Sequence, residues 1–265
     1  MNLQELLDPV VQLAKQAGDA ILEVYATDFD VETKNDASPL TRADMASHLV
    51  IEKGLAQLTP DIPIISEESG LPRFEERRQW QQYWLIDPLD GTKEFVKRNG
   101  EFTVNIALID GNRPLMGVVH VPVLGKTYTG CEIIGAAIRE NDGATRQIKV
   151  AEVTANPVRI VGSRSHRGHS LDALITQLGG AEILPMGSSL KFCVIAEGGA
   201  DIYPRLGPTS EWDTAAAQAV VEQAGGKVLK LDGSPLTYNT KRDILNPYFL
   251  VAGPMDREWL SLLQA

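Results

Sequence analysis

Two aspartates three residues apart, Asp87 and Asp90, carry the first sign of chemistry in this chain. They follow the apolar run 83–86, which the pattern predicts to be a buried strand ending at Pro88, because proline cannot continue a central strand. The next residues, Gly91-Thr92, are typical of a helix start. Carboxylates at such a junction can hold a cation, and the free N–H groups of a new helix can hold an anion. The alternative is an ordinary turn in which Asp90 caps the helix.

Three further acidic residues lie at the ends of predicted elements. Glu67, the first of a Glu-Glu pair, follows the predicted strand 62–65. Asp44 comes three residues after Thr41, where a helix is expected to begin, and Asp213 is expected to open an alanine-rich helix. Each has an ordinary alternative, since acidic residues are common at solvated strand ends and in helix caps.

Four of these carboxylates could converge in a cleft between the two halves of the chain: Glu67, Asp87, Asp90 and Asp213. Two carboxylates about 4 Å apart repel by on the order of 4 kcal/mol at an effective dielectric constant of about 20. Divalent cations remove that penalty. Oxygen ligands without a histidine or cysteine cluster favour Mg²⁺ or Mn²⁺ over zinc.

The elements that would position these residues change in character along the chain. A helix is predicted over residues 3–25 and a second from Thr41, followed by about six strands within 62–150, which implies an antiparallel or mixed sheet flanked by two helices. Beyond Asn156-Pro157, strands and helices alternate, as in an α/β fold. We therefore expect an α+β domain at 1–156 that carries most metal ligands, and an α/β domain at 157–265 that carries Asp213.

Composition limits the classes of function. The chain has 265 residues, 43% of them hydrophobic and 23% charged, as is ordinary for a soluble enzyme. A net charge of −10 argues against binding a nucleic-acid polymer, which needs a basic surface, but not against a small anion held through metal ions. Cys131 and Cys193 lie in apolar surroundings and are expected to be reduced, which favours the cytoplasm. No signal peptide and no membrane-spanning segment is expected.

Three motifs in this order resemble the signatures of the lithium-sensitive, magnesium-dependent inositol-monophosphatase superfamily: Glu67-Glu68, Asp87-Pro88-Leu89-Asp90-Gly91-Thr92 and Trp212-Asp213-Thr214-Ala215-Ala216. Residues 87–100, 102–108, 163–166, 187–192 and 203–208 are similar to its bacterial 3′(2′),5′-bisphosphate nucleotidases, and Lys93-Glu94-Phe95 stands where inositol phosphatases usually carry Thr-Asn-Phe. The resemblance implies a layered αβαβα sandwich with the active site between the halves. It also implies hydrolysis of the 3′-phosphate of 3′-phosphoadenosine 5′-phosphate to AMP and phosphate, which clears a by-product of sulfate assimilation.

The same resemblance implies roles for single residues. Two or three Mg²⁺ ions, with Mn²⁺ as a substitute, would be held by Glu67, Asp87, the Leu89 carbonyl, Asp90 and Asp213. Thr92, paired with Asp44, would orient the attacking water, and Glu67 competes for that role through a third metal ion. The implied substrate-binding residues are Glu67, Leu89, Asp90, Gly91, Thr92, His166, Ser188, Ser189, Lys191, Arg205 and Asp213. From local sequence alone, Lys191 is as well explained as a snorkelling helix lysine and Arg205 as a solvated loop charge.

Two other functions stay open at this stage. A phosphatase of the same fold could act on inositol monophosphates or sugar bisphosphates, but a monophosphate has no second phosphate for Lys191 and Arg205 to bind. A protein of another class, an acidic ion-binding module without catalysis, is the second alternative. The resemblance allows peripheral association with the inner membrane, although the sequence has no basic amphipathic face that predicts it. The oligomeric state is left open.

Overall fold

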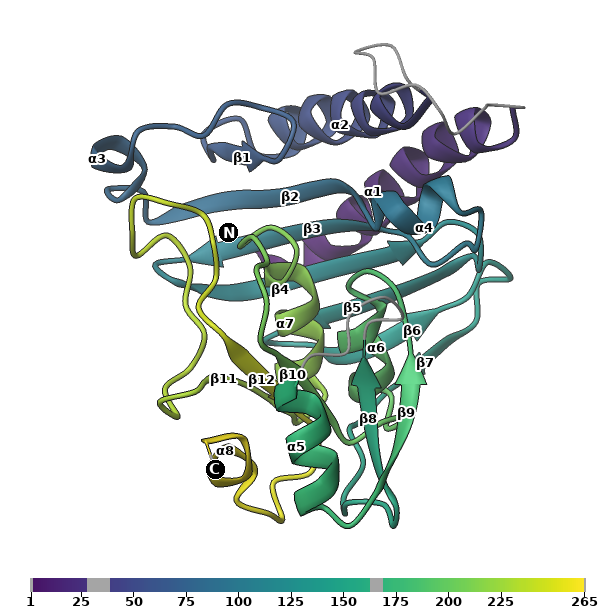
Figure 1. Cartoon of the computed structure of the whole chain (residues 1–265). Helices are drawn as coiled ribbons and strands as arrows, with labels where there is room; N and C mark the ends of the chain where they lie inside the picture. The colour runs from purple at the N-terminus through teal and green to yellow at the C-terminus, as the bar shows by residue number, and fades with distance from the viewer. Residues whose placement is uncertain (1, 28–38, 163–168, 265) are drawn as a thin grey trace.

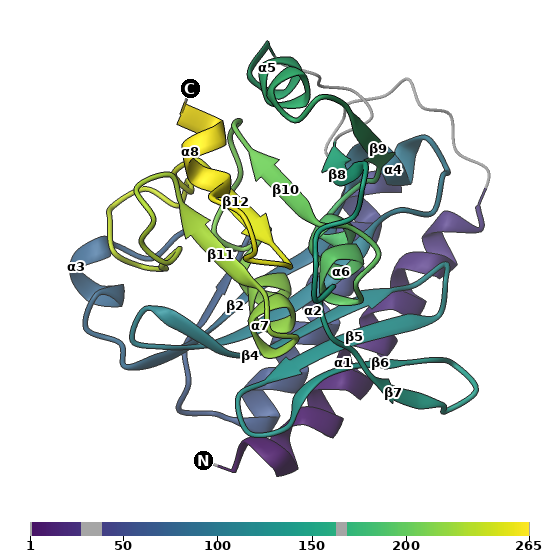
Figure 2. The same cartoon turned by 90° about the horizontal axis from the view of Figure 1, so that it is seen from below.

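The computed structural model describes residues 2–27, 39–162 and 169–264, and its elements stack in five layers (Figures 1 and 2). Helices α1 (Leu3–Tyr25) and α2 (Pro39–Leu58) cover one face of a seven-stranded sheet. Helices α6 (Leu190–Ala196) and α7 (Ala215–Gln223) lie between that sheet and a five-stranded one. Helices α5 (His169–Gln177) and α8 (Trp259–Gln264) cover the outer face of the second sheet. The αβαβα sandwich expected from the resemblance is confirmed.

The first sheet contains, in spatial order, β1 (Ile64–Ser66), β2 (Gln82–Asp90), β3 (Thr103–Asp110), β4 (Arg113–Val121), β5 (Lys126–Cys131), β6 (Gly135–Arg139) and β7 (Thr145–Gln147). Strands β1 and β2 pair in parallel, and all other neighbours pair antiparallel, so the expected mixed sheet is confirmed. The short helix α3 (Phe74–Arg77) joins β1 to β2, and α4 (Thr92–Val96) joins β2 to β3.

The prediction that the strand ends at Pro88 is wrong. Strand β2 continues to Asp90, because its pairing with β3 shifts register: Asp87 lies opposite Asn105, but Asp90 lies opposite Thr103. One extra residue on β2 makes a bulge, where a proline is tolerated because it need not donate to the ladder. The bulge places both aspartates at the same end of the strand.

Two predicted helix starts are also displaced. Helix α2 begins at Pro39, so Thr41 lies within its first turn and does not cap it; proline suits such a position because its missing N–H has no partner to lose. The residue that precedes α7 as its N-cap is Thr214, not Asp213. Asp213 is therefore free of a capping role in α7.

The second sheet has the order β11 (Lys227–Lys230), β12 (Phe249–Ala252), β10 (Ile202–Arg205), β8 (Val158–Gly162) and β9 (Ala181–Pro185). Its strands β10, β8 and β9 are parallel, and β12 runs antiparallel to both of its neighbours. The alternation of strand and helix predicted beyond residue 157 is confirmed, apart from α8, which the sequence pattern did not indicate. The division into domains at residue 156 stays a prediction.

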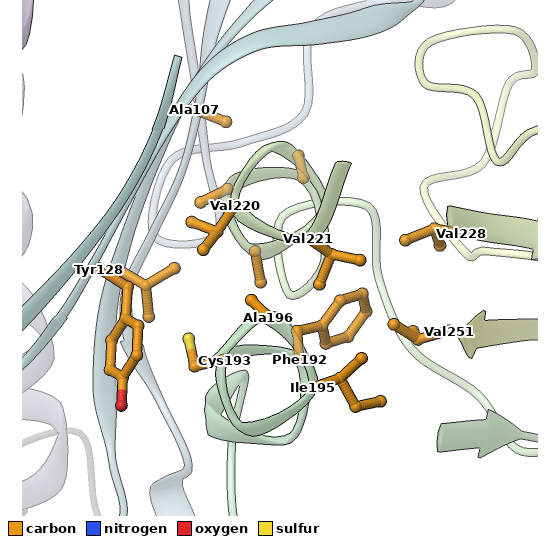
Figure 3. Packing of buried hydrophobic residues seen from close by; sticks show 14 of the residues in the cluster. Ala107, Tyr128, Phe192, Cys193, Ile195, Ala196, Val220, Val221, Val228 and Val251 are labelled. Atoms are coloured by element: carbon orange, nitrogen blue, oxygen red, sulfur yellow. The ribbon is translucent and has the colours of Figure 1, made fainter. Parts of the chain in front are cut away.

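The core between the sheets brings α7 close to the first sheet. Figure 3 shows Val220 and Val221 of α7, Phe192 and Cys193 of α6, and Tyr128 of β5 packed together. A β-carbon on Gly117 of β4 would lie 2.0 Å from the carbonyl oxygen of Ala216, so only glycine fits there. The small residues at the start of α7 permit this approach, which places the residues just before the helix against the sheet.

Among the described residues, no helix has both the length and the apolar character needed to cross a lipid bilayer. Cys131 and Cys193 are buried and unpaired, as expected.

Candidate active site

Three carboxylates from distant parts of the chain meet at one end of the first sheet. Glu67 follows β1, Asp87 lies in β2, and Asp213 precedes α7; one carboxylate oxygen of each lies within 4.8 Å of the others. The Glu67 N–H donates to the Ile86 carbonyl at 3.3 Å, which extends the parallel β1–β2 pairing to the glutamate. The two halves of the chain therefore both contribute to the cluster, as the sequence analysis expected.

Asp90 joins the cluster from the far side of the bulge. Its Oδ2 accepts the backbone N–H of Ser189 at 2.5 Å, just before α6. The Ser47 hydroxyl of α2 donates to the Pro88 carbonyl at 2.8 Å, and the Leu89 N–H donates to Asp87 Oδ1 at 3.1 Å. These bonds hold the bulge, and the two aspartates with it, in one arrangement. The roles expected for the Leu89 carbonyl and for Glu67 in catalysis stay predictions.

The carboxylates raise one another's proton affinity. Asp87 is 1% exposed, and burial, followed by the charges of Asp90, Glu67 and Asp213, raises its pKa well above the usual range. Burial and then the Asp90 charge raise the pKa of Asp213 to about 7. Burial also raises the pKa of Asp90, although the nearby Lys191 ammonium opposes the shift. The site therefore favours protons or cations over free negative charge.

Asp44 lies at the edge of this cluster, on α2. It is buried, and its Oδ1 has no hydrogen-bond partner. Burial and the charges of Glu68 and Glu67 raise its pKa to about 8. The charge of Asp44 in turn acts on Asp87, and the predicted pairing of Asp44 with Thr92 stays a prediction.

The described residues fit a divalent cation. The cluster offers only oxygen donors, several carboxylates share one small space, and one buried carboxylate oxygen lacks a partner. Hard cations such as Mg²⁺, Mn²⁺ and Ca²⁺ take such ligands, whereas zinc sites usually include histidine or cysteine.

A glycine makes the turn beside the cluster. Gly91 has φ 98°, a left-handed conformation that disfavours other residues, and precedes α4 as its N-cap. A β-carbon there would lie 3.1 Å from the Glu101 carbonyl oxygen and 3.2 Å from Ser188 Cβ. Gly91 therefore lets the loop before α6 come against the start of α4. Phosphate binding by the N–H groups of Gly91 and Thr92 stays a prediction.

A cleft of about 180 Å³ opens from the carboxylates toward a group of cationic and aromatic side chains. Lys191 is 9% exposed, its Nζ lies 5.6 Å from the centre of the Tyr203 ring, and burial lowers its pKa. Arg205 Nε donates to the Gly207 carbonyl at 3.2 Å. The cleft is lined by Asp90, Gly91, Lys93, Glu94, Met186, Gly187, Ser188, Ser189, Lys191, Phe192, Tyr203, Arg205, Thr209, Asp213 and Thr214.

These contacts decide between the alternatives for the two basic residues. Lys191 is buried in the cleft and does not snorkel to solvent, and Arg205 belongs to β10 and is half-buried, so it is not a solvated loop charge. Both face the same cleft as Asp90 and Asp213. His166, expected in this set, lies outside the described residues.

The two serines before α6 differ in their surroundings. Ser188 lines the cleft with φ 43°. The Ser189 hydroxyl lies 2.8 Å from both Thr103 Oγ1 and Asn105 Oδ1, and its N–H holds Asp90. Since these bonds occupy the Ser189 hydroxyl, this residue is better placed to orient Asp90 than to bind substrate.

Two polar residues of the site were missed from the sequence. Tyr203 contacts both Lys191 and Arg205, and Asn105 lies opposite Asp87 in the sheet. A buried asparagine inside the otherwise apolar strand 102–108 was the available signal for the second. Tyr203 gave none, since an aromatic residue in a strand is ordinarily part of the core.

Together the layered fold and the carboxylate cluster define a metal-dependent type of active site, and the comparisons place it in a family. The model of the inositol monophosphatase family matches residues 2–260. The chain belongs to this family, which confirms the resemblance found in the sequence.

Several relatives carry the same name. The 3′(2′),5′-bisphosphate nucleotidase CysQ of Escherichia coli O157:H7 is 53% identical over 249 residues, which cover 93% of this chain and 99% of that protein. The CysQ nucleotidase of Haemophilus influenzae is 35% identical over 262 residues, 98% of this chain and 97% of that protein.

Solved structures agree with the fold. A crystal structure of CysQ from Bacteroides thetaiotaomicron, described as a bacterial member of the inositol monophosphatase family, has a TM-score of 0.85 and 40% identity, and the match covers 96% of this chain and all of that one. An inositol monophosphatase from Zymomonas mobilis has a TM-score of 0.82 with full coverage of both chains, and at 21% identity it supports the fold alone.

Proposed function

We propose that this protein is a 3′(2′),5′-bisphosphate nucleotidase that hydrolyses the 3′-phosphate of 3′-phosphoadenosine 5′-phosphate to AMP and phosphate. One observation carries the proposal: Asp90 and Asp213 line the same cleft as Lys191 and Arg205. A carboxylate cluster suits the phosphate that reacts, because it can hold the metal ions, and two basic side chains suit a second phosphate. The names of the close relatives support the same substrate.

The carboxylates Glu67, Asp87, Asp90 and Asp213, with the Leu89 carbonyl, are the groups that would hold the metal ions. When bound, divalent cations activate a water molecule and stabilise the leaving oxygen of an in-line displacement. The N–H groups of Gly91 and Thr92 would hold the reacting phosphate, and Asp44 would accept a proton through the Thr92 hydroxyl. We propose Mg²⁺, two or three ions, with Mn²⁺ as a substitute.

The remaining donors would hold the nucleotide. Lys191 and Arg205 would bind the second phosphate, and the buried Tyr203 orients both, since its ring contacts Lys191 and its hydroxyl bonds Arg205. Ser188 and His166 add polar contacts. We place this activity in the cytoplasm, where unpaired cysteines such as Cys131 and Cys193 persist.

The alternative within the family is a phosphatase for inositol monophosphates or sugar bisphosphates. A substrate with a single phosphate, such as inositol monophosphate, would leave the buried Lys191 without a phosphate to bind. The test compares phosphate release from 3′-phosphoadenosine 5′-phosphate, inositol 1-phosphate and fructose 1,6-bisphosphate with Mg²⁺ present. We expect strong preference for the nucleotide; preference for either other substrate would overturn the assignment, and no release from any of them would favour an ion-binding protein.

Two variants make the test specific. Lys191→Ala should raise KM for the nucleotide by about 10- to 100-fold with little change in kcat, because a hydrogen bond to a charged group contributes about 1.5–3 kcal/mol. Lys97→Ala, an exposed lysine after α4, is the matched control. Asp90→Asn should abolish release, and retained activity in that variant would remove the carboxylate cluster from the mechanism.

A further inference from the structure

Among the buried charged side chains outside the cleft, two lie in the segments that lead to the carboxylate cluster. Arg77, at the end of α3, is 0% exposed, and Glu211, two residues before Asp213, is 1% exposed. Burying an ion costs several kcal/mol unless partners satisfy it. Their partners therefore indicate what this part of the fold holds in place.

Arg77 fastens α3 to the connection between β11 and β12, which reaches up to that helix in Figure 1. Its guanidinium donates to the side-chain oxygen of Asn239 and to the carbonyls of Lys241 and Arg242, at 2.8 and 2.7 Å for the carbonyls. Asn239 Nδ2 donates back to the Arg77 carbonyl at 2.7 Å. The end of α3 and residues 239–242 are thus joined by four hydrogen bonds.

The connection between β11 and β12 also forms hydrogen bonds with the segment before Asp213. Glu211 Oε2 accepts the N–H of Asn239 at 2.8 Å, and Oε1 lies 3.2 Å from Lys241 Nζ. Asn246 Nδ2 donates to the Ser210 carbonyl at 2.8 Å. Residues 209–211 are therefore held from outside the cleft by a polar network, which we define as Arg77, Asn239, Lys241 and Glu211.

Each end of this network is continuous with a carboxylate of the cluster. Asp213 Oδ2 accepts the Ser210 N–H at 2.9 Å, so its direction depends on the segment that Glu211 anchors. Glu67 and Arg77 both lie in the connection between β1 and β2. Glu67 and Asp213, which approach from opposite halves, are thus joined a second time behind the site.

We propose that the Arg77–Asn239–Lys241–Glu211 network is a positioning device that fixes the Glu67 and Asp213 carboxylates relative to each other and thereby sets the affinity of the site for divalent cations. The proposal rests on the metal centre of the proposed function. If the network only stabilised the fold, its loss would lower the melting temperature without changing metal affinity.

The test measures Mn²⁺ binding to the metal-free, full-length protein by the EPR signal of free Mn²⁺, with Mg²⁺ as competitor. Glu211→Gln should weaken binding about tenfold, because changes in outer partners of metal ligands typically cost 10- to 100-fold in affinity. The matched control is Asp201→Asn, which removes another fully buried carboxylate, paired with Arg159 at 2.7 Å in the second sheet. It should lower the melting temperature and leave the affinity unchanged.

A double-mutant cycle tests the path through Asp213. Asp213→Asn alone should weaken binding, and adding Glu211→Gln should weaken it little further, because both changes remove the same carboxylate from its place. If Glu211→Gln does not fold, Asn246→Ala removes the side-chain donor to the Ser210 carbonyl and to the hydroxyls of Thr209 and Thr214, and it should shift the affinity in the same direction. Wild-type affinity in the folded variant, or full additivity in the cycle, would overturn the proposal.

Because nucleotide hydrolysis is not the readout, the two proposals fail separately. A protein that does not hydrolyse the nucleotide but loses metal affinity in Glu211→Gln keeps the network and loses the substrate assignment. If the protein hydrolyses the nucleotide and Glu211→Gln leaves metal affinity unchanged, the substrate assignment stands and the positioning role of the network is refuted.

Discussion

Lowering the pH from 8 to 6 should weaken metal binding by about tenfold through one side chain. Asp213 has a pKa of about 7 in the metal-free protein, because it is buried and faces Asp90. A metal ion needs the deprotonated carboxylate, whose fraction is about one in eleven at pH 6 and about ten in eleven at pH 8. The apparent affinity follows that fraction. The raised pKa of Asp87 makes the real dependence steeper.

The assay is Mn²⁺ binding followed by EPR at several pH values between 6 and 8, with Mg²⁺ titrations by calorimetry in two buffers of different ionisation enthalpy. The calorimetry should detect proton release on binding near pH 6 and less near pH 8. Asp213→Asn should bind more weakly and show a shallower pH dependence, whereas Asp61→Asn, an exposed aspartate, should behave as wild type. An affinity that stays constant from pH 6 to 8 would refute the reasoning.

Three further predictions follow from the same structure. In the metal-free protein, the pKa of Asp44 is raised from 3.8 to about 8, so between pH 3.8 and 8 the folded chain binds more protons than the unfolded one. The free energy of unfolding should therefore fall as pH rises through this range. Urea denaturation in the presence of a chelator measures it, and a rise with pH would contradict the prediction. Gly117→Ala should destabilise the fold by about 1–3 kcal/mol or more, because its β-carbon would meet the Ala216 backbone, whereas Gly70→Ala, with open space around it, should leave the melting temperature nearly unchanged. Ser189→Ala should lower stability by about 1 kcal/mol and leave KM for the nucleotide almost unchanged, and a KM effect as large as that of Lys191→Ala would restore its hydroxyl to the substrate site.

The sequence predicts those parts of the site that depend on residues close together in the chain. Asp87 and Asp90 stand out because carboxylates follow an apolar strand, and the mixed sheet and the α/β half follow from the order of strands and helices, whereas the layered sandwich was implied by the family resemblance. The strand end at Pro88 could not be placed correctly, because a bulge depends on the register of β3, and register is a relation between strands. Local signals predict which residues carry chemistry better than where an element stops.

The sequence could not show which way each side chain points. Ser189 and Lys191 belong to one short motif, yet the hydroxyl of the first is used inside the protein and the ammonium of the second faces the cleft. Tyr203 looked like an ordinary strand residue, and Asn105 stood out only as a polar residue in an apolar strand, until the second sheet and α6 were in place. Their roles arise from packing between elements far apart in the chain.

The arrangement of charge explains why the site needs both halves of the molecule. Without a cation, the charge of Asp213 helps to raise the pKa of Asp87, and the charge of Asp90 helps to raise the pKa of Asp213, so the cluster opposes its own assembly at neutral pH. Bonds away from the cluster must therefore hold it together, and those of Arg77 and Glu211 lie where such support is needed. A bound cation reverses the sign of the interaction, because the same carboxylates then share one counter-charge. Metal binding should consequently stabilise the contact between the halves, and the metal-induced rise in melting temperature should be smaller in Asp213→Asn than in wild type.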